Sequence, residues 1–480
     1  MGSDAAARRG AAAGAANASV VQLHRSAWTL RRPRLPESLT ARALPRRWAE
    51  FLQPPGTANH VEKLADISNV QYFGDVELGS PGQKLTVIFD TGSSDLWVPR
   101  TKYDPGRSST LGCPGSGCNK EVTIQYSVGS VQGKILVDRL DIAGCVIPEF
   151  SFVLAEKTTD LEDRYFDGVL GLGFPYLSHT GSKVLSDLSQ QAGVNVFSFL
   201  LEDEAGESWL VFGPPPVEWI SPGSLVYADL ALQAWWTFEG ALSVGGTVVA
   251  EKTYLALDTG TSFIAVPSPY HEAIIRMLLP VEQLDSCTQY TPMNTLLCPC
   301  SSISAAETVY ITVGGLDFPI YPRDLFTPMG SPFGGDGDQY WCILEIQASS
   351  DALPFILGDT FLRGVAAVFD IGKPQVGLAP RPGRNATAQV PRAGPILPPH
   401  RPSYSSALSL DALACGIIIV VGLVLGYLGG HLMGCALDAW QRRRRKAAAP
   451  APPGDDGDGV PYVCFASACG CLAPKRACPK

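Results

Sequence analysis

Two aspartates far apart in the chain stand in nearly the same sequence context. Asp90 lies in the stretch Ile-Phe-Asp-Thr-Gly-Ser-Ser, and Asp258 lies in Ala-Leu-Asp-Thr-Gly-Thr-Ser. Each follows an apolar run and begins a tight turn. Each copy also has a later echo of two apolar residues and a glycine, at 169–171 and at 356–358. This duplication predicts a chain that folds twice and brings two carboxylates face to face.

Two such carboxylates have a definite chemistry. Placed about 3 Å apart they cannot both ionise, so they share one proton over an acidic range. One acts as a base toward a water molecule while its protonated partner polarises a substrate carbonyl. The titration belongs to the pair, so the proton is assigned to neither residue. A single Asp-Thr-Gly is weak evidence because turns are rich in Asp and Gly, but two copies with matching echoes indicate acid–base activation of water.

The residues after each aspartate are suited to hold it. A glycine lets the backbone pass close to the opposite turn. Backbone N–H groups and the next hydroxyl are expected to donate to the carboxylate, and the threonines are expected to join the two turns. The predicted support residues are Thr91, Gly92 and Ser93 in the first turn and Thr259, Gly260 and Thr261 in the second.

Length and composition point to a β-rich protein of two lobes with additional segments. The chain has 480 residues, too many for one ordinary core. It contains 49 Gly and 39 Pro with little helical periodicity, which indicates short strands joined by turns. We therefore expect an all-β fold.

Charge is distributed unevenly along the chain. Residues 1–65 carry 10 basic and 4 acidic side chains and residues 386–480 carry 10 and 5, which leaves 17 basic and 37 acidic side chains in 66–385. This acidic middle part agrees with simple solubility or with work at low pH, where carboxylates are protonated and repel less. A nucleic-acid partner is not expected.

An apolar segment near the end of the chain predicts a single membrane span. Ala412 to Leu437 is almost wholly apolar and long enough to cross a bilayer, and a basic run follows at 441–446. The positive-inside rule places this run in the cytosol and the preceding lobes in a lumen or outside the cell. Residues 1–19 lack the apolar core of a secretory signal, so we expect either a missing upstream segment, which we favour, or a weak Ala-rich signal.

Seven cysteines precede the apolar segment and are expected to form disulfides in an oxidising compartment. The predicted pairs are Cys113–Cys118, Cys300–Cys342 and, as a weaker third pair, Cys287–Cys298, which leaves Cys145 as a thiol. No cysteine has metal-ligand spacing with a nearby histidine, so neither a metal nor a cofactor is expected. Sequons at Asn385 and, more weakly, Asn17 predict N-glycosylation.

With these motifs, the chain resembles the pepsin-like aspartic endopeptidases, and its motifs are most similar to those of the cathepsin D and pepsin group. The resemblance covers about residues 66–380 and implies two β-rich lobes with one aspartate each and a polypeptide substrate lying between them. It is carried by Tyr72-Phe73-Gly74, 87–99 with Asp90 and Trp97, 166–173, 258–262, 300–303 and 356–370.

The resemblance also implies a β-hairpin flap over the substrate. Residues 124–130, followed by Gly133, fit its position, with Tyr126 bonding toward Trp97 and Gly129 permitting the tight tip. Ser127 and Val128 stand where Gly and a hydroxyl residue are commoner in the family, which affects specificity and not the reaction.

The resemblance, together with changes in composition and strand pattern along the sequence, predicts that the chain has six parts. The predicted parts are an N-terminal region and basic propeptide at 1–62, a first lobe at 66–220, a second lobe at 221–380, a flexible Pro/Arg-rich stalk at 381–410, a transmembrane helix at 411–440 and a cytosolic tail at 441–480.

We therefore expect a monomeric aspartic endopeptidase, made as a zymogen and anchored as a single-pass type I protein of the secretory or endolysosomal system. Its partners would be polypeptide substrates and the membrane. The alternative is a catalytically inactive receptor or binding module on the same fold, which would be expected to have lost an aspartate or its glycine.

Overall fold

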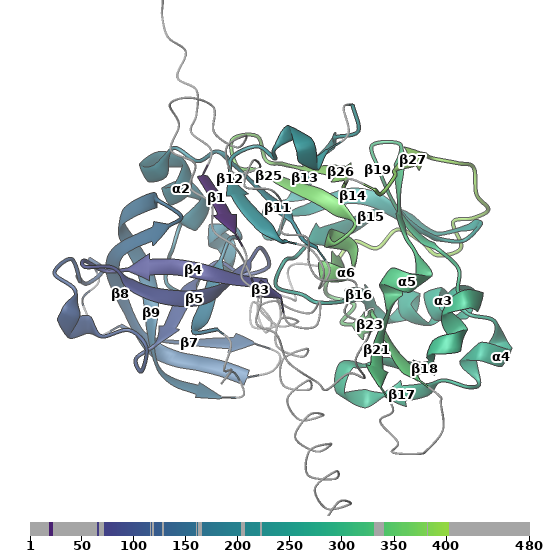
Figure 1. The fold of residues 1–480 in the computed structure, drawn as a ribbon, viewed down its shortest axis with the longest axis horizontal. Coiled ribbons are helices and arrows are strands. Elements are labelled where there is room, and N and C mark those ends of the chain that lie inside the picture. The colour runs from purple at the N-terminus through teal and green to yellow at the C-terminus, as the bar shows by residue number, and fades with distance from the viewer. Residues whose placement is uncertain are drawn as a thin grey trace, which may run out of the picture. The chain divides into compact units, whose positions relative to one another are not determined.

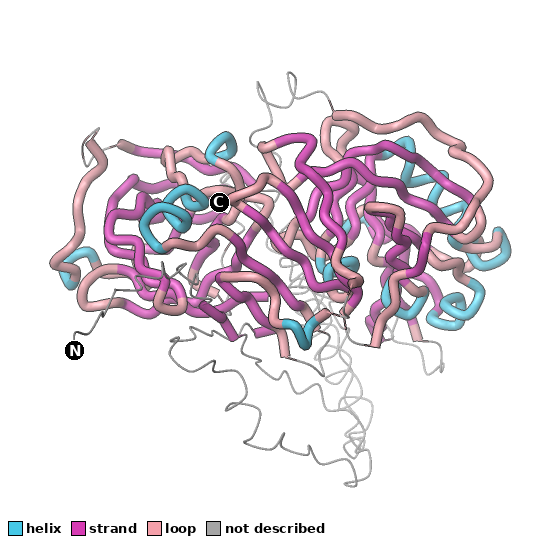
Figure 2. Tube along the Cα trace, turned by 90° about the horizontal axis from the view of Figure 1, so that it is seen from above, coloured by secondary structure: helices cyan, strands magenta, loops and turns pink. Residues whose placement is uncertain are grey.

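The computed structural model describes residues 19–22, 65–66, 72–115, 117, 120–126, 129–159, 161, 166–202, 207–220, 223–330, 340–381 and 383–402. All of them belong to one compact unit, residues 1–430. Strands are the commonest element of the described trace, and the helices are short (Figures 1 and 2). The fold is therefore mostly β, as the sequence predicted, although it includes helices as well.

The first lobe is built on an eight-stranded sheet, drawn on the left of Figure 1. Its strand order is β3-β4-β5-β10-β6-β9-β8-β7. Buried aliphatic and aromatic side chains of these strands, such as Val87, Phe89 and Phe152, form its core. The strands are β3 (Ala65–Asp66), β4 (Tyr72–Leu78), β5 (Gln83–Asp90), β6 (Leu96–Pro99), β7 (Glu121–Tyr126), β8 (Gly129–Ile142), β9 (Cys145–Thr159) and β10 (Gly168–Gly171).

The second lobe is built on a fourteen-stranded sheet, which also includes strands from the N-terminal region and from the range predicted for the first lobe. Its main path is β1-β12-β11-β25-β26-β13-β14-β15-β24-β16-β23, with β19, β20 and β27 attached at β14. The strands are β1 (Ser19–Gln22), β11 (Val196–Leu200), β12 (Trp209–Phe212), β13 (Val226–Leu232), β14 (Thr237–Val244), β15 (Thr247–Leu257), β16 (Ile264–Pro267), β19 (Val309–Val313), β20 (Leu316–Ile320), β23 (Ile346–Ser349), β24 (Phe355–Leu357), β25 (Val365–Asp370), β26 (Gln375–Pro380) and β27 (Thr387–Ala388).

Two strands of the range predicted for the first lobe belong to this larger sheet. β11 pairs antiparallel with β25, and β12 pairs with both β11 and β1. Phe197 of β11 stacks on Phe369 of β25 with ring centroids 4.8 Å apart. A shared sheet therefore joins the two halves of the duplicated chain.

Short helices and a small four-stranded sheet complete the second lobe. In α3 (Ser268–Leu278) the apolar side chains at i, i+4, i+5 and i+8 are buried, beginning at Tyr270. The small sheet has the order β17-β18-β22-β21. Its strands are β17 (Thr288–Tyr290), β18 (Thr295–Pro299), β21 (Phe326–Gly330) and β22 (Trp341–Leu344). The other helical segments of this lobe are α4 (Val281–Leu284), α5 (Pro322–Leu325), α6 (Asp359–Leu362) and the 3₁₀ turns η5 (Thr291–Met293) and η6 (Cys300–Ala305). The range predicted for the first lobe contains α2 (Val184–Ala192) and the 3₁₀ turns η2 (Pro105–Arg107), η3 (Pro175–Leu177) and η4 (Val217–Trp219).

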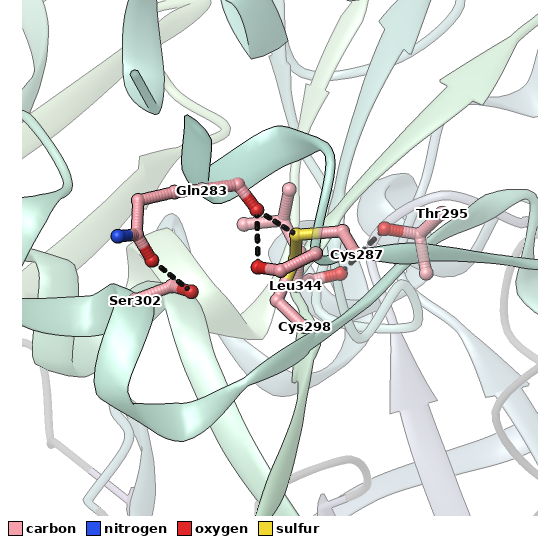
Figure 3. Close-up of a disulfide and its surroundings, with 7 residues drawn as sticks. Gln283, Cys287, Thr295, Cys298, Ser302 and Leu344 are labelled. Atoms are coloured by element: carbon pink, nitrogen blue, oxygen red, sulfur yellow. Dashed lines mark hydrogen bonds between the residues drawn. A yellow bond between two sulfur atoms is a disulfide. The ribbon is translucent and has the colours of Figure 1, made fainter. Parts of the chain in front are cut away.

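Two disulfides brace the small sheet, and both were predicted. Cys287 bonds to Cys298 of β18 (Figure 3), and Cys300 bonds to Cys342 of β22. Cys298 and Cys342 are directly opposite each other in the β18–β22 pair, so the two bridges lie side by side. Cys113 is also disulfide-bonded, but its predicted partner Cys118 lies outside the described residues.

The segment predicted as a flexible stalk takes a different form. Residues 383–402 run along the second lobe, and β27 within them pairs antiparallel with β20. The expectation of a flexible stalk from 381 onward was wrong for this part, because composition does not reveal that the second lobe provides strand edges and buried acidic partners. Residues 403–410 lie outside the described residues.

No helix in the described ranges is long and apolar enough to cross a bilayer. The predicted span at 411–440 lies outside those ranges, as do the tail and most of the predicted propeptide.

Candidate active site

Asp90 is the last residue of β5, and the first echo lies directly beside it. β10 runs parallel to β5 with Gly171 opposite Asp90. A Cβ atom on Gly171 would lie 2.4 Å from the backbone nitrogen of Ser94, so only glycine lets the two segments approach this closely. The echo predicted at 169–171 is therefore the strand that holds the aspartate turn from behind.

The second turn is built in the same way. Asp258 follows β15, and β24 runs parallel to β15 with Leu357 opposite Leu257. The backbone N–H of Asp258 donates to the Leu357 carbonyl over 3.2 Å. A Cβ atom on Gly358 would lie 2.2 Å from the carbonyl oxygen of Thr261. The second echo thus has the same function as the first.

Each carboxyl is held by the residues that follow it. Asp90 accepts from the backbone N–H of Gly92 over 2.8 Å and from the Ser93 hydroxyl. Asp258 accepts from the N–H of Gly260 over 2.9 Å and from the Thr261 hydroxyl over 2.8 Å, an arrangement that matches the first turn.

The two turns are also bonded to each other. The Thr259 hydroxyl donates to the carbonyl of Phe89 over 2.7 Å, and the Thr91 hydroxyl donates to the carbonyl of Leu257 over 3.1 Å. Each threonine hydroxyl also accepts from the backbone N–H of the other, at 3.0 and 3.1 Å. A Cβ on Gly92 would lie 2.4 Å from Oδ2 of Asp258. The structure therefore brings together all eight residues predicted for the two turns.

Burial and mutual contact control the charge of the pair. Asp90 and Asp258 are 0% and 4% exposed. Burial raises the pKa of Asp90 well above its ordinary value, and the negative charge of Asp258 raises it further. Burial also raises the pKa of Asp258. Because the two turns are bonded to each other and the charge of Asp258 acts on Asp90, the two carboxyls titrate as a pair.

Sequence reasoning missed the buried acid behind the first turn. Asp95 is 3% exposed and accepts from Ser178, from both donors of Thr180 and from the backbone N–H of His179, at 2.7–3.1 Å. The His179 ring lies 3.0 Å away as well. Burial alone would raise the pKa of Asp95, but these hydrogen bonds outweigh it and lower the pKa. An acidic residue directly before the apolar strand Leu96–Pro99, just after the turn, was the available signal.

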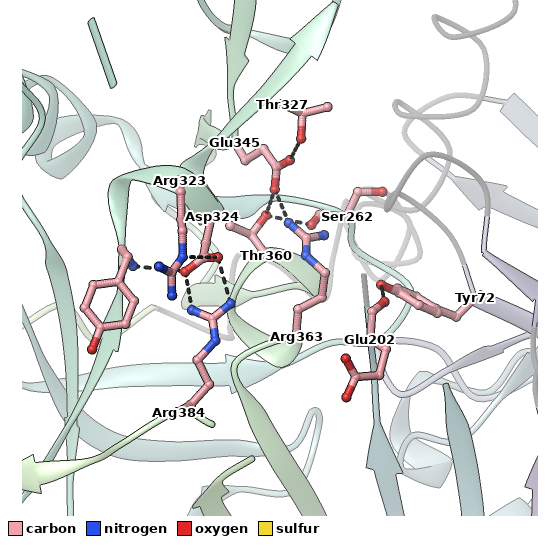
Figure 4. Close-up of polar contacts among 11 residues, drawn as sticks. Tyr72, Glu202, Ser262, Arg323, Asp324, Thr327, Glu345, Thr360, Arg363 and Arg384 are labelled. Atoms are coloured by element: carbon pink, nitrogen blue, oxygen red, sulfur yellow. Dashed lines mark hydrogen bonds and ion pairs between the residues drawn. The ribbon is translucent and has the colours of Figure 1, made fainter. Parts of the chain in front are cut away.

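A different network stands behind the second turn (Figure 4). Glu345 is 1% exposed and accepts from Thr360 of α6 and from the Arg363 guanidinium, both over 2.6 Å, and from the Thr327 hydroxyl. Thr360 in turn donates through its backbone N–H to the carbonyl of Ser262, over 3.0 Å. A buried ion pair thus holds the helix that follows Gly358 against the Asp258 turn.

The predicted flap is described only in part. β7 and β8 form a hairpin in which Tyr126 pairs with Gly129. Ser127 and Val128 lie outside the described residues, as does the side chain of Tyr126. The Trp97 ring nitrogen is buried with no hydrogen-bond partner among the described atoms. The contact expected between Tyr126 and Trp97 therefore stays a prediction.

Within the described ranges, no group of three or more His, Cys, Asp or Glu side chains lies close enough to hold a metal ion. Of the two sequons, Asn385 is exposed beside β27, and Asn17 lies outside the described residues.

The described site lies within a segment that matches a known family. The model of the family named Eukaryotic aspartyl protease matches residues 71–381, which include both aspartate turns and both echoes. The chain belongs to the eukaryotic aspartyl proteases. It is therefore an aspartic endopeptidase by family, and its pepsin-like fold is that of the relatives below.

Several pepsin-like proteins are similar over most of their length. Pepsin A of Rhinolophus ferrumequinum is 28% identical over 354 residues, which cover 69% of this chain and 86% of that protein. Cathepsin E of Rattus norvegicus is 33% identical over 345 residues, covering 66% and 82%. Gastricsin of Callithrix jacchus is 28% identical over 341 residues, covering 65% and 82%.

Proposed function

We propose that Asp90 and Asp258 are the catalytic pair of this aspartic protease and hydrolyse peptide bonds within extended polypeptides. The observation that carries the proposal is the pair itself: two buried carboxyls on turns that are bonded to each other, each carboxyl held by the glycine N–H and the hydroxyl of its own turn. Both turns keep their aspartate and glycine, so nothing in the described site favours an inactive binding module.

The geometry supports a simple sequence of proton movements. The ionised carboxyl removes a proton from a water molecule, and the water oxygen attacks the carbonyl carbon of the substrate. The protonated carboxyl donates to the carbonyl oxygen, which develops negative charge. The resulting gem-diol breaks its C–N bond as the amine nitrogen receives the proton taken from water, and one hydroxyl of the diol returns its proton to the other carboxyl, which restores the pair. The shared proton keeps both acid and base forms present in the acidic range.

The test replaces each aspartate separately. Asp90→Asn and Asp258→Asn are expected to lower kcat for a pepsin-type peptide by about 10²–10⁴-fold, because each variant removes one half of the acid–base pair. Asp229→Asn, at an exposed position of β13, is the matched control. Pepstatin should inhibit the parent and the control. Equal cleavage by the parent and either active-site variant would show that the pair is not the catalyst.

We further propose that the chain is made as a zymogen. β1, within the basic N-terminal region, pairs with β12 at the edge of the large sheet, so part of the leader is built into the enzyme fold. Protonation of carboxylates at low pH would weaken attraction between the basic leader and the acidic lobes. Purified precursor should shorten and become active on acidification, and a precursor that does neither would contradict the proposal.

The proposed topology is single-pass type I, with the lobes in the lumen of the secretory or endolysosomal system or outside the cell. Its support is the apolar stretch 412–437 followed by the basic run 441–446. The disulfides of the second lobe agree with an oxidising compartment. Retention in membranes after carbonate extraction, with the lobes protected from added protease, tests this topology.

A further inference from the structure

Residues 383–402, which we call the strap, lie beyond the matched family segment, which ends at 381. The strap leaves the end of β26 and crosses the second lobe. It lies between the catalytic fold and the apolar stretch 412–437, so its attachment decides where the chain leaves the lobe.

Backbone hydrogen bonds hold the strap along its length. Near its start, β27 pairs with β20. In the middle, the backbone of Val248 donates to Ala393 over 2.6 Å and accepts from Ile396 over 3.1 Å. At the end, the carbonyl of His400 accepts from the N–H of Tyr254 over 3.1 Å. The strap is therefore joined to the second lobe at three separate places.

A buried ion pair fastens its middle. Arg392 lies 2.8 Å from Asp317, and the two side chains are 4% and 0% exposed. The Arg392 guanidinium also stacks over the ring of Tyr310, with 4.1 Å to its centroid, and Asp317 accepts from Thr312 over 2.6 Å. Detaching the strap would leave the Asp317 carboxylate buried without its cation, which is strongly unfavourable.

The last residues of the strap are held close to the catalytic strands. A His400 ring nitrogen lies 2.7 Å from the carbonyl of Leu353, and the ring packs edge-on against both Tyr270 and Phe355. The Tyr270 hydroxyl donates to the carbonyl of Pro398 over 2.8 Å. Tyr254, which His400 contacts, precedes Asp258 by four residues of the chain, or about 13 Å along a strand.

We propose that the strap confines the enzyme to substrates held at the membrane surface. This inference rests on the proposed topology. Only residues 403–411 separate the strap from the apolar stretch, so they reach at most about 30 Å. If the chain left the lobe at 381, the same connection would reach about 100 Å. The docked strap thus keeps the aspartate pair within about 55 Å of the bilayer, adding to both estimates about 5 Å between the paired strands and about 7 Å for residues 401 and 402.

The substrate class follows from this limit. A membrane-anchored polypeptide with a cleavable sequence close to its own span shares the same thin layer as the active site, so its effective concentration is high. Polypeptides whose cleavable sequence is held far above the membrane fall outside the reach of the tether. We therefore assign membrane-proximal segments of anchored proteins as the preferred substrates.

The experiment uses the full chain and two anchored reporters carrying the same pepsin-type sequence. Semi-rigid helical spacers of about 20 and about 67 residues hold this sequence about 30 Å and about 100 Å from the reporter span. One variant has 40 Gly/Ser residues inserted between Pro402 and Ser403, which raises the reach to about 165 Å. The matched control carries the same insertion after Pro450, in the tail.

The parent and the tail control are expected to cut the near reporter at least about tenfold faster than the far one, whereas the variant lengthened after Pro402 should cut both within about threefold. All three should have the same kcat/KM for a soluble peptide. Equal cutting of both reporters by the parent overturns the inference while leaving the proposed topology intact. Loss of the chain from membranes on carbonate extraction overturns the topology and the inference with it, and leaves the catalytic proposal untouched.

Discussion

The two aspartate turns share one backbone design but differ in what stands behind them. In each, a parallel strand ends at a glycine or directly before one, this glycine lies against the turn, and the carboxyl accepts from a glycine N–H and a hydroxyl. Behind the first turn, Asp95 is a buried anion. At the corresponding place in the second turn stands Phe263, packed with Met293 and Ile343.

This difference shows which features the shared chemistry requires. The turn, the echo glycine and the crossing threonines occur twice because the two carboxyls must meet symmetrically. The supports differ because any arrangement that holds the turn is sufficient: hydrogen bonds to an anion in the first lobe, and an apolar cluster with the Glu345–Arg363 pair in the second.

The largest expected effect comes from breaking the support of the second turn. Arg363→Met leaves Glu345 buried without its cation and should lower the free energy of unfolding by about 3–5 kcal/mol. Arg276→Met is the matched control, because the Arg276–Glu272 pair is exposed and should contribute at most about 1 kcal/mol. Urea denaturation measures the free energy of unfolding of both variants. An equal decrease in the two would show that the buried pair is no more important than the exposed one.

A smaller effect tests whether the echoes are equivalent. Gly171→Ala and Gly358→Ala each place a methyl group within 2.4 Å of backbone atoms of a turn, so each should lower the free energy of unfolding by about 1–3 kcal/mol. Each should also reduce cleavage of a pepsin-type peptide.

Gly246→Ala, where a Cβ meets nothing within 4 Å, is the control for these two variants. Thermal unfolding midpoints and rates of peptide cleavage, measured for all three variants, compare the two echo glycines with this control. A large loss at one echo and none at the other would show that the two turns do not depend on their echoes alike.

The smallest effect is a pH dependence of stability with opposite sign at two acids, Asp95 behind the first turn and Asp258 in the second. The pKa of Asp95 is lowered on folding, so its ionised form contributes stability above its unfolded value of about 4, and this is lost as pH falls through the folded pKa. The pKa of Asp258 is raised, so stability falls as pH rises from about 4 toward that pKa.

Asp95→Asn should therefore be less stable than the parent at pH 6, with the difference shrinking in strong acid. Asp258→Asn should be more stable than the parent at pH 7, with the difference shrinking below about pH 4. Unfolding midpoints measured across pH check both slopes. Parallel slopes for the two variants would contradict the opposite environments described here.

Most of the candidate site could be predicted because its signals are local. Asp90, Asp258 and the residues after each could be recognised from short repeated stretches, and two disulfides from cysteine positions. The supports could not, because Asp95 meets Ser178 and Thr180, and Glu345 meets Arg363, only after distant segments pack. The docking of the strap could not be predicted for the same reason, because nothing in the sequence around Arg392 indicates that it pairs with the buried Asp317.

The sequence by itself determined the repeated turns, the glycines that permit their close approach and the family chemistry these imply, because backbone geometry at a tight turn depends on a few neighbouring residues. Only the tertiary structure decided that the two turns bond to each other with both carboxyls buried, which side chains stand behind them and that residues 383–402 join the second lobe. These contacts join segments that are far apart in sequence. Whether a buried charge is stabilised or costly depends on which distant residue packs against it, and neighbouring residues in the sequence do not specify that partner.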